Sequence, residues 1–146
     1  MWKRMKRVVS SRVDAILEKN NDGITPDRLF QLKLEELEAN LAKSRHAVME
    51  AQAHVRSLEE SLVKADKDIA ETDARIREAV ALENDSLAKE RIYHLQNHQL
   101  RRSGITVQLE EARQILAKVQ EVHEQAKMVT ERRKVEAEIE YGVFRK

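Results

Sequence analysis

The fold is decided by residues 34–82, which divide into seven heptads: LEELEAN, LAKSRHA, VMEAQAH, VRSLEES, LVKADKD, IAETDAR and IREAVAL. Each heptad opens with an aliphatic residue, namely Leu34, Leu41, Val48, Val55, Leu62, Ile69 and Ile76. The residues three positions later are mostly small, namely Leu37, Ser44, Ala51, Leu58, Ala65, Thr72 and Ala79. An unbroken seven-residue period predicts a long helix that buries one seam against another helix.

The composition supports long helices with polar outer faces. Charged residues make up 36% of the 146 residues and aromatic residues 3%, with three glycines and one proline. A helix from about Pro26 to Leu82 would be roughly 85 Å long, too long for a compact domain of this size. We therefore predict an all-α fold, in which an N-terminal amphipathic helix precedes a long antiparallel coiled-coil helical hairpin. Such a chain is expected to act as a scaffold or to form assemblies.

The charge distribution and the turn signals divide the chain into two parts. Residues 1–19 carry six basic and two acidic side chains, a net charge of +4, which leaves −3 for the rest of a chain whose total is +1. A turn-forming run, Asn-Asn-Asp-Gly at 20–23, separates the two parts. We expect a membrane-binding amphipathic helix at 1–22 and a helical hairpin at 23–146.

Capping residues set the expected limits of the hairpin helices. Thr25 is a favourable N-cap and Pro26 suits the first helical position. The heptad pattern meets the polar run Glu-Asn-Asp-Ser at 83–86, which predicts the hairpin tip. The helices are expected at about 25–82 and 87–141.

The second helix has a looser apolar stripe without a strict heptad, at Leu95, Ile105, Leu109, Ala112, Ile115, Leu116, Val119, Val122, Ala126 and Val129. Such a stripe can face one partner along its length and another on its flank. If the chain folds back at residue 84 or 85, residues whose numbers sum to about 168 or 169 lie opposite each other. The expected pairs are Ile76 with Ile92, Leu62 with Ile105, Leu58 with Leu109, and Val48 with Val119.

The same arithmetic places His123 near Ser44 or His46. The predicted hairpin seam comprises Leu34, Leu37, Leu41, Val48, Val55, Leu58, Leu62, Ile69, Ile76, Ile105, Leu109, Ala112 and Val119. A two-helix hairpin has one narrow seam and encloses no core, so most of its stability has to come from neighbours. We therefore expect a homo-oligomer or polymer. Gly104 predicts a bend or a close helix approach in the second helix.

The N-terminal segment has the pattern of a membrane-surface helix. At 100° per residue, five apolar side chains fall within an arc of about 80° with a basic residue at each edge; they are Met5, Ile16, Val9, Trp2 and Val13, flanked by Lys6 and Arg12. Basic stems can lie on lipid while their charged ends reach phosphates, and tryptophan favours the headgroup boundary. The predicted membrane-binding residues are Trp2, Lys3, Arg4, Met5, Lys6, Arg7, Val9, Arg12, Val13 and Ile16. The alternative is that this face docks on another helix of the same protein.

Other kinds of site have little support in the sequence. His94 and His98 have the spacing of a zinc-binding pair, but a solvated polar face is about ten times more common for such a pair without a third ligand. We expect no metal, no cofactor and no enzyme activity. The chain has no cysteine, and no apolar run approaches the roughly 20 residues that cross a bilayer. The short basic start does not suit nucleic acid. A soluble cytoplasmic protein is expected.

Several features together resemble the phage shock protein A family, which includes the vesicle-inducing protein in plastids and belongs to the ESCRT-III superfamily. They are the amphipathic start, Asp-Ala-Ile-Leu-Glu-Lys at 14–19, the turn before Pro26, Glu-Glu-Leu-Glu at 35–38 and the alanine-studded helix with Arg45. A second match is Ala-Leu-Glu-Asn-Asp-Ser-Leu-Ala-Lys at 81–89, which is similar to the family's hairpin tip.

The resemblance implies a peripheral protein on the cytoplasmic face of the cell membrane that polymerises and binds anionic lipids through its first helix. Envelope-stress protection and membrane remodelling would follow. It also implies helices beyond Gly142 that this sequence does not contain, which indicates a short natural variant or a shortened form. The alternative function is that of a coiled-coil regulator or structural spacer that binds a protein, for example one that inhibits a transcriptional activator ATPase.

Overall fold

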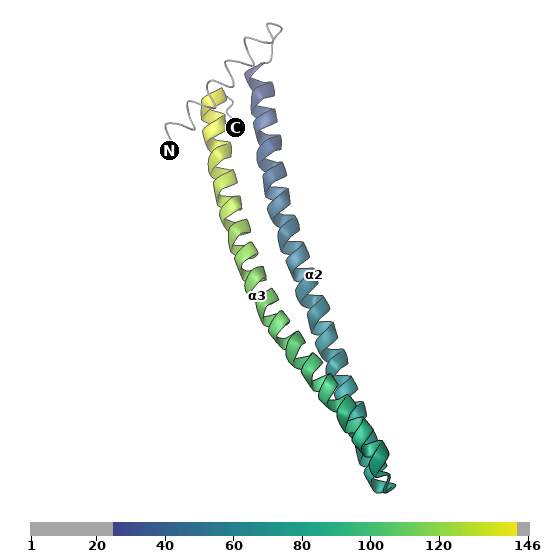
Figure 1. The fold of residues 1–146 in the computed structure, drawn as a ribbon. Coiled ribbons are helices and arrows are strands. Elements are labelled where there is room, and N and C mark those ends of the chain that lie inside the picture. Colours follow the sequence, from purple (N-terminus) through teal and green to yellow (C-terminus); the bar gives the residue numbers. More distant parts are fainter. Residues whose placement is uncertain (1–24, 143–146) are drawn as a thin grey trace. The chain divides into compact units, whose positions relative to one another are not determined.

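The computed structural model describes residues 25–142, which form two helices, α2 (Pro26–Ala81) and α3 (Asp85–Tyr141). The helices are antiparallel and pack side by side, and residues 25–142 contain no strand (Figure 1). The predicted all-α helical hairpin is confirmed. The amphipathic helix expected at 1–22 lies outside the described residues.

Helix α2 begins as the capping residues predict. The Thr25 side-chain oxygen Oγ1 accepts a hydrogen bond from the Arg28 backbone N–H at 3.2 Å, and Pro26 occupies the first helical position. From there the helix continues for 56 residues without a break. The aliphatic heptad therefore lies on one continuous helix.

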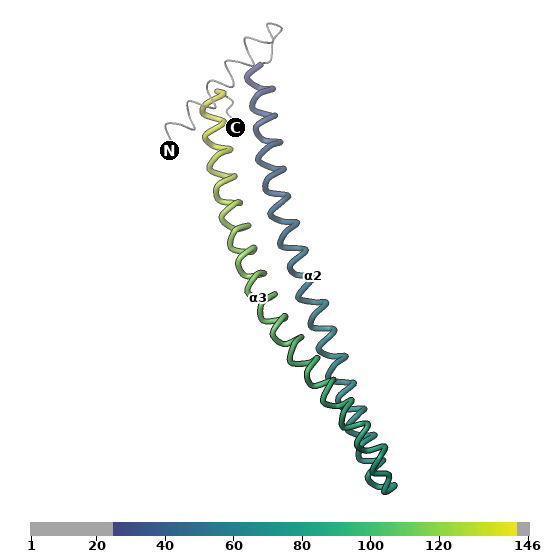
Figure 2. Tube along the Cα trace, in the orientation of Figure 1, coloured from purple at the N-terminus to yellow at the C-terminus, as the bar shows by residue number. Residues whose placement is uncertain are grey.

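The chain reverses within three residues, 82–84, and α3 begins at Asp85, two residues earlier than predicted (Figure 2). Glu83 has a φ of 54°, and its N–H donates to the Val80 carbonyl at 3.0 Å. The Asn84 N–H donates to the Ala79 carbonyl at 3.0 Å, which completes a Schellman motif. Asn84 also caps α3, because its Oδ1 accepts from the Leu87 N–H at 3.2 Å. One asparagine thus serves both helix ends.

The described hairpin consists of two compact units. Unit 1 comprises residues 25–44 and 123–142, and unit 2 comprises residues 45–122 with the hairpin turn. In unit 2, the central cluster is formed by Val55, Leu58, Leu109 and Ala112, with Leu62 and Leu116 packed against it. Leu58 and Leu109 thus meet, as the fold-back pairing predicted. In unit 1, the buried apolar side chains are Leu29, Phe30, Leu37 and Ala137.

The inward positions of α3 repeat every seven residues, contrary to the prediction of a loose stripe. The buried or half-buried positions that follow this repeat are Ala88, Arg91, Leu95, His98, Ile105, Leu109, Ala112, Leu116, Val119, His123, Ala126, Thr130, Arg133 and Ala137. Leu87, Lys134, Glu136, Glu138 and Tyr141 are half-buried outside the repeat, and Arg102 is exposed within it. The predicted pairing of Ile92 with Ile76 is wrong, because Ile92 is 42% exposed and Arg91 occupies the inward position. Apolar residues alone do not show this heptad, because charged and polar residues occupy several of its inward positions.

Candidate assembly surface

The predicted seam residues all lie at covered positions. Six are buried, namely Leu37, Val55, Leu58, Ile105, Leu109 and Ala112. Seven are half-buried, namely Leu34, Leu41, Val48, Leu62, Ile69, Ile76 and Val119. The predicted membrane-binding residues lie outside the described residues, namely Trp2, Lys3, Arg4, Met5, Lys6, Arg7, Val9, Arg12, Val13 and Ile16. The structure therefore informs the hairpin part of the predicted site.

A buried polar pair in unit 1 fixes the alignment of its two helices. Ser44 Oγ lies 2.7 Å from His123 Nδ1, and His123 is only 8% exposed. Ser44 donates its single hydroxyl hydrogen to the Leu41 carbonyl at 2.9 Å. With the hydroxyl hydrogen directed at Leu41, the Ser44 oxygen accepts from His123 when Nδ1 carries the ring hydrogen. The prediction that His123 lies near Ser44 is confirmed.

The residue numbers of this pair sum to 167, one less than the predicted range. In unit 2, the same sum pairs Leu58 with Leu109, which share one cluster. Residue numbers that sum to 167 also place Arg91 opposite Ile76 and Arg102 opposite Ala65. Sequence reasoning missed these polar residues of α3, although projecting the heptad of α2 through a strict register would have found them.

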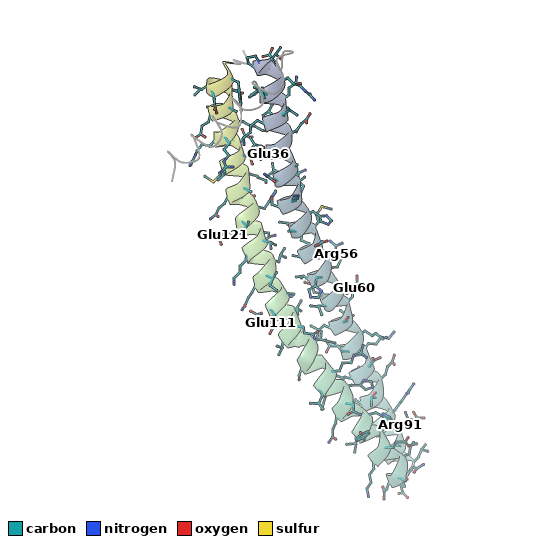
Figure 3. All side chains as sticks on the ribbon, turned by 45° about the horizontal axis from the view of Figure 1, so that its top comes forward. Glu36, Arg56, Glu60, Arg91, Glu111 and Glu121 are labelled. Atoms are coloured by element: carbon teal, nitrogen blue, oxygen red, sulfur yellow. The ribbon has the colours of Figure 1, made fainter. Side chains whose placement is uncertain are left out.

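Ion pairs link the helices at the edges of the seam. In unit 2, Arg102 Nε bonds Asp66 Oδ1, and Arg113 Nη2 lies 3.5 Å from Glu59 Oε1. These side chains are about half exposed. Other charged side chains, such as Glu60 and Glu111, are also exposed (Figure 3). Exposed pairs contribute little stability, at about 0–1 kcal/mol each. The apolar seam therefore dominates the packing.

Helix α3 has a second apolar stripe within unit 2, which we call the outer stripe. It consists of Leu100, Val107, Ile115 and Val122, which are 71%, 60%, 55% and 58% exposed. At 100° per residue, these four positions fall within an arc of about 80°. The centre of this arc lies roughly 140° from the seam positions around Leu109. The outer stripe therefore faces away from α2.

Gly104 lies within the arc of the outer stripe, between Leu100 and Val107. A Cβ atom at this position would meet nothing within 4 Å, and α3 continues through it without a break. The expected close approach of another helix at Gly104 is therefore wrong within the described residues, and the expected bend stays a prediction. The glycine instead leaves the outer stripe without a side chain at one point, where another backbone could approach.

Chemical sites are scarce in the part of the chain that the structure describes. Residues 25–142 contain no group of three or more histidine, cysteine, aspartate or glutamate residues arranged to hold a metal. His94 Nε2 lies 4.0 Å from Glu90 Oε1, and both side chains are exposed. Among the same residues, neither helix is long and apolar enough to cross a bilayer.

Within residues 25–142, the pKa of Tyr141 is clearly perturbed. Partial burial at the end of α3 raises the pKa of the Tyr141 phenol above 10.0, and the negative charges of Glu140 and Glu36 raise it further. All three residues belong to unit 1. The raised pKa of Tyr141 therefore reflects the packing of unit 1.

Comparison with protein families gives a match over nearly the whole chain. A model of the PspA/IM30 family matches residues 1–140 of the 146. A comparison with curated proteins gives no significant match. The family match covers both the basic amphipathic segment and the hairpin.

Proposed function

Because the chain belongs to the PspA/IM30 family, a family of membrane-associated proteins, we propose that it is a peripheral membrane protein that self-assembles and stabilises or remodels membranes. Its role is structural, in the manner of ESCRT-III-like proteins under envelope stress. Its place is the inner face of the cell membrane, where its partners are anionic lipids and further copies of itself. The hairpin supplies the assembly surface and residues 2–17 supply the membrane contact.

The observation that carries this proposal is the outer stripe of α3. A helix that buries one apolar stripe and exposes another on the opposite side is suited to two packing partners. In unit 2 the first partner is α2, and the exposed apolar side chains of the outer stripe, with Glu111 and Lys118 between them in the same arc, offer a second face to a partner. A second copy of the chain is the partner that an assembling protein always has available.

The membrane contact rests on the sequence of the N-terminal segment. Its apolar face would enter the headgroup region while its basic side chains reach lipid phosphates. Each basic residue near an anionic surface contributes about 1 kcal/mol, so several of them give reversible attachment. Attachment would concentrate the hairpins on one surface, which favours their packing side by side.

Co-sedimentation with vesicles tests the membrane part. The full chain should sediment with vesicles of anionic lipid and bind neutral vesicles weakly. The variant Trp2→Glu with Val9→Glu should remain in the supernatant, because two carboxylates then lie in the apolar arc. The matched control, Val63→Glu with Val80→Glu, places the same charge on exposed apolar positions of α2 and should bind like the original.

Equal vesicle binding by the Trp2→Glu, Val9→Glu variant would remove the membrane claim. In that case the same exposed stripe would serve a protein-binding regulator or spacer. Hydrogen exchange of residues 1–19 distinguishes the two functions. Vesicles should protect these amides if the membrane proposal is right, and should leave their exchange unchanged if it is wrong.

A further inference from the structure

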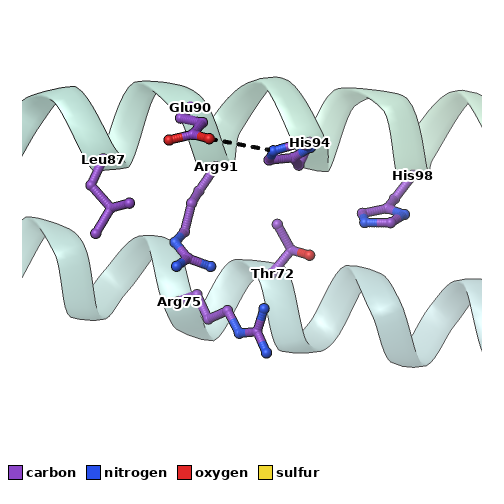
Figure 4. Close-up of a pocket in the computed structure, with 7 residues that line it drawn as sticks. All are labelled: Thr72, Arg75, Leu87, Glu90, Arg91, His94 and His98. Atoms are coloured by element: carbon purple, nitrogen blue, oxygen red, sulfur yellow. Dashed lines mark ion pairs between the residues drawn. The ribbon is translucent and has the colours of Figure 1, made fainter.

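A hollow next to the hairpin turn in unit 2 is lined mostly by polar and charged side chains. It lies between the two helices and has a volume of about 350 Å³, at the lower end of the range for ligand sites. Six of the residues that line it are polar or charged, namely Thr72, Arg75, Glu90, Arg91, His94 and His98 (Figure 4).

The charge around this hollow is positive. Its lining includes two guanidinium groups, those of Arg75 and Arg91, and one carboxylate, that of Glu90. The carboxylate of Glu90 is directed towards His94, with Oε1 at 4.0 Å from Nε2 (Figure 4). Within residues 25–142, no carboxylate forms an ion pair with Arg75 or Arg91. The hollow therefore holds more cationic than anionic side chains, and neither arginine is paired with a carboxylate in the described residues.

Arg91 gives the most direct sign of a missing ligand. Its side chain extends from α3 towards α2 at an inward seam position, where the register places Ile76 opposite (Figure 4). Its Nε atom is buried and has no hydrogen-bond acceptor. A buried donor without an acceptor is costly, and more so when it is charged. An anion in the hollow would supply the acceptor.

We propose that this hollow binds a phosphate group, which we call the tip phosphate site. Phosphate oxygens match the planar fork of arginine, and Arg91 and Arg75 can each donate two hydrogen bonds to them. The Thr72 hydroxyl and the His98 ring add further donors at the same hollow. The phosphate group belongs either to a free phosphate ion or to a lipid headgroup. This proposal does not depend on the N-terminal segment.

The test measures binding of inorganic phosphate to the full chain, by phosphorus NMR line broadening at constant ionic strength. The variant Arg75→Gln with Arg91→Gln should bind at least about tenfold more weakly, since it lacks both charge-assisted forks. The matched control, Lys89→Gln with Arg101→Gln, removes the same charge from exposed positions of α3 outside the hollow. It should bind within about twofold of the original chain.

Two further variants separate binding from folding. Thr72→Val keeps both guanidinium groups and should weaken binding by a smaller factor. Arg91→Leu replaces an unsatisfied cation with an apolar side chain opposite Ile76. Its thermal midpoint in chloride should equal or exceed that of the original chain, while its phosphate binding is lost. A lower midpoint with unchanged phosphate binding would contradict the proposal.

The source of the phosphate is decided with dihexanoyl phosphatidic acid, which carries the lipid headgroup on a water-soluble molecule. Tighter binding of this lipid than of inorganic phosphate assigns the site to a headgroup, and equal or weaker binding assigns it to the free ion. If neither ligand binds, or if the Lys89→Gln, Arg101→Gln control loses as much binding as the Arg75→Gln, Arg91→Gln variant, there is no tip phosphate site.

Discussion

The Ser44–His123 hydrogen bond shows how single residues specify the alignment of the helices in unit 1. A buried donor and acceptor that meet in one register are separated in any other, and separation leaves both unsatisfied. Apolar layers tolerate slippage better, because one aliphatic side chain replaces another. Polar residues of the seam therefore contribute more to the specificity of the helix alignment than to the stability of the fold.

We predict that Ser44→Ala lowers the free energy of unfolding by about 1–3 kcal/mol, because the buried His123 Nδ1 loses its hydrogen-bond partner. The double variant Ser44→Ala, His123→Leu should recover most of this loss, since it removes both polar partners. Chemical denaturation of the four chains of this cycle measures the coupling. Additive effects of the two substitutions would mean that the hydrogen bond does not contribute.

Tyr141 predicts a loss of stability at alkaline pH. Its pKa is raised in the folded chain by burial and by Glu140 and Glu36, so the unfolded chain ionises first, near pH 10.0. The stability contributed by the neutral phenol is complete below that pH and is lost as the pH rises through the folded pKa. Unfolding midpoints between about pH 9 and pH 11 should fall less for Tyr141→Phe than for Tyr93→Phe, a matched change at an exposed tyrosine. Equal declines would contradict this.

At the scale of elements, the turn between α2 and α3 depends on two residues with different roles. Glu83 has a left-handed backbone conformation that favours glycine, and Asn84 joins the end of one helix to the start of the next. The turn can therefore be tight, at three residues. Its energetics can be tested at each position separately.

We predict that Glu83→Gly raises the free energy of unfolding by about 1 kcal/mol, because glycine adopts a positive φ without steric cost. Asn84→Ala should lower it by about 1 kcal/mol, since α3 loses its N-cap. Thermal and chemical unfolding of both variants provide the measurement. Stabilisation by Asn84→Ala, or destabilisation by Glu83→Gly, would show that the turn differs from this description.

The sequence predicted the elements well where one physical signal dominated. The aliphatic heptad and the capping residues Thr25 and Pro26 gave α2 almost to the residue. The heptad of α3 was missed because Arg91, His98 and His123 occupy inward positions, and a search for apolar periodicity rejects such residues. The hollow near the turn was missed for the same reason, since its arginines are distant in sequence and meet only through the register.

At the scale of the whole molecule, the seam packs the two helices together within each unit, and the proposed self-assembly depends on the outer stripe. The heptad residues of α2 are buried or half-buried, while α3 exposes Leu100, Val107, Ile115 and Val122 in unit 2. A monomeric hairpin would gain nothing from these four side chains. Self-assembly would cover them, and it is the claim on which the proposed function depends most.

Sedimentation velocity of the full chain with a single charge on the outer stripe tests this claim most directly. Val107→Glu changes the stripe, and Val63→Glu makes the same change on α2 at a comparably exposed site, 70% against 60%. Both variants should keep the helical content of the original chain. We predict that the original chain and Val63→Glu sediment as large assemblies while Val107→Glu sediments as a small species. Large assemblies of Val107→Glu, equal in size to those of the original chain, would contradict the account.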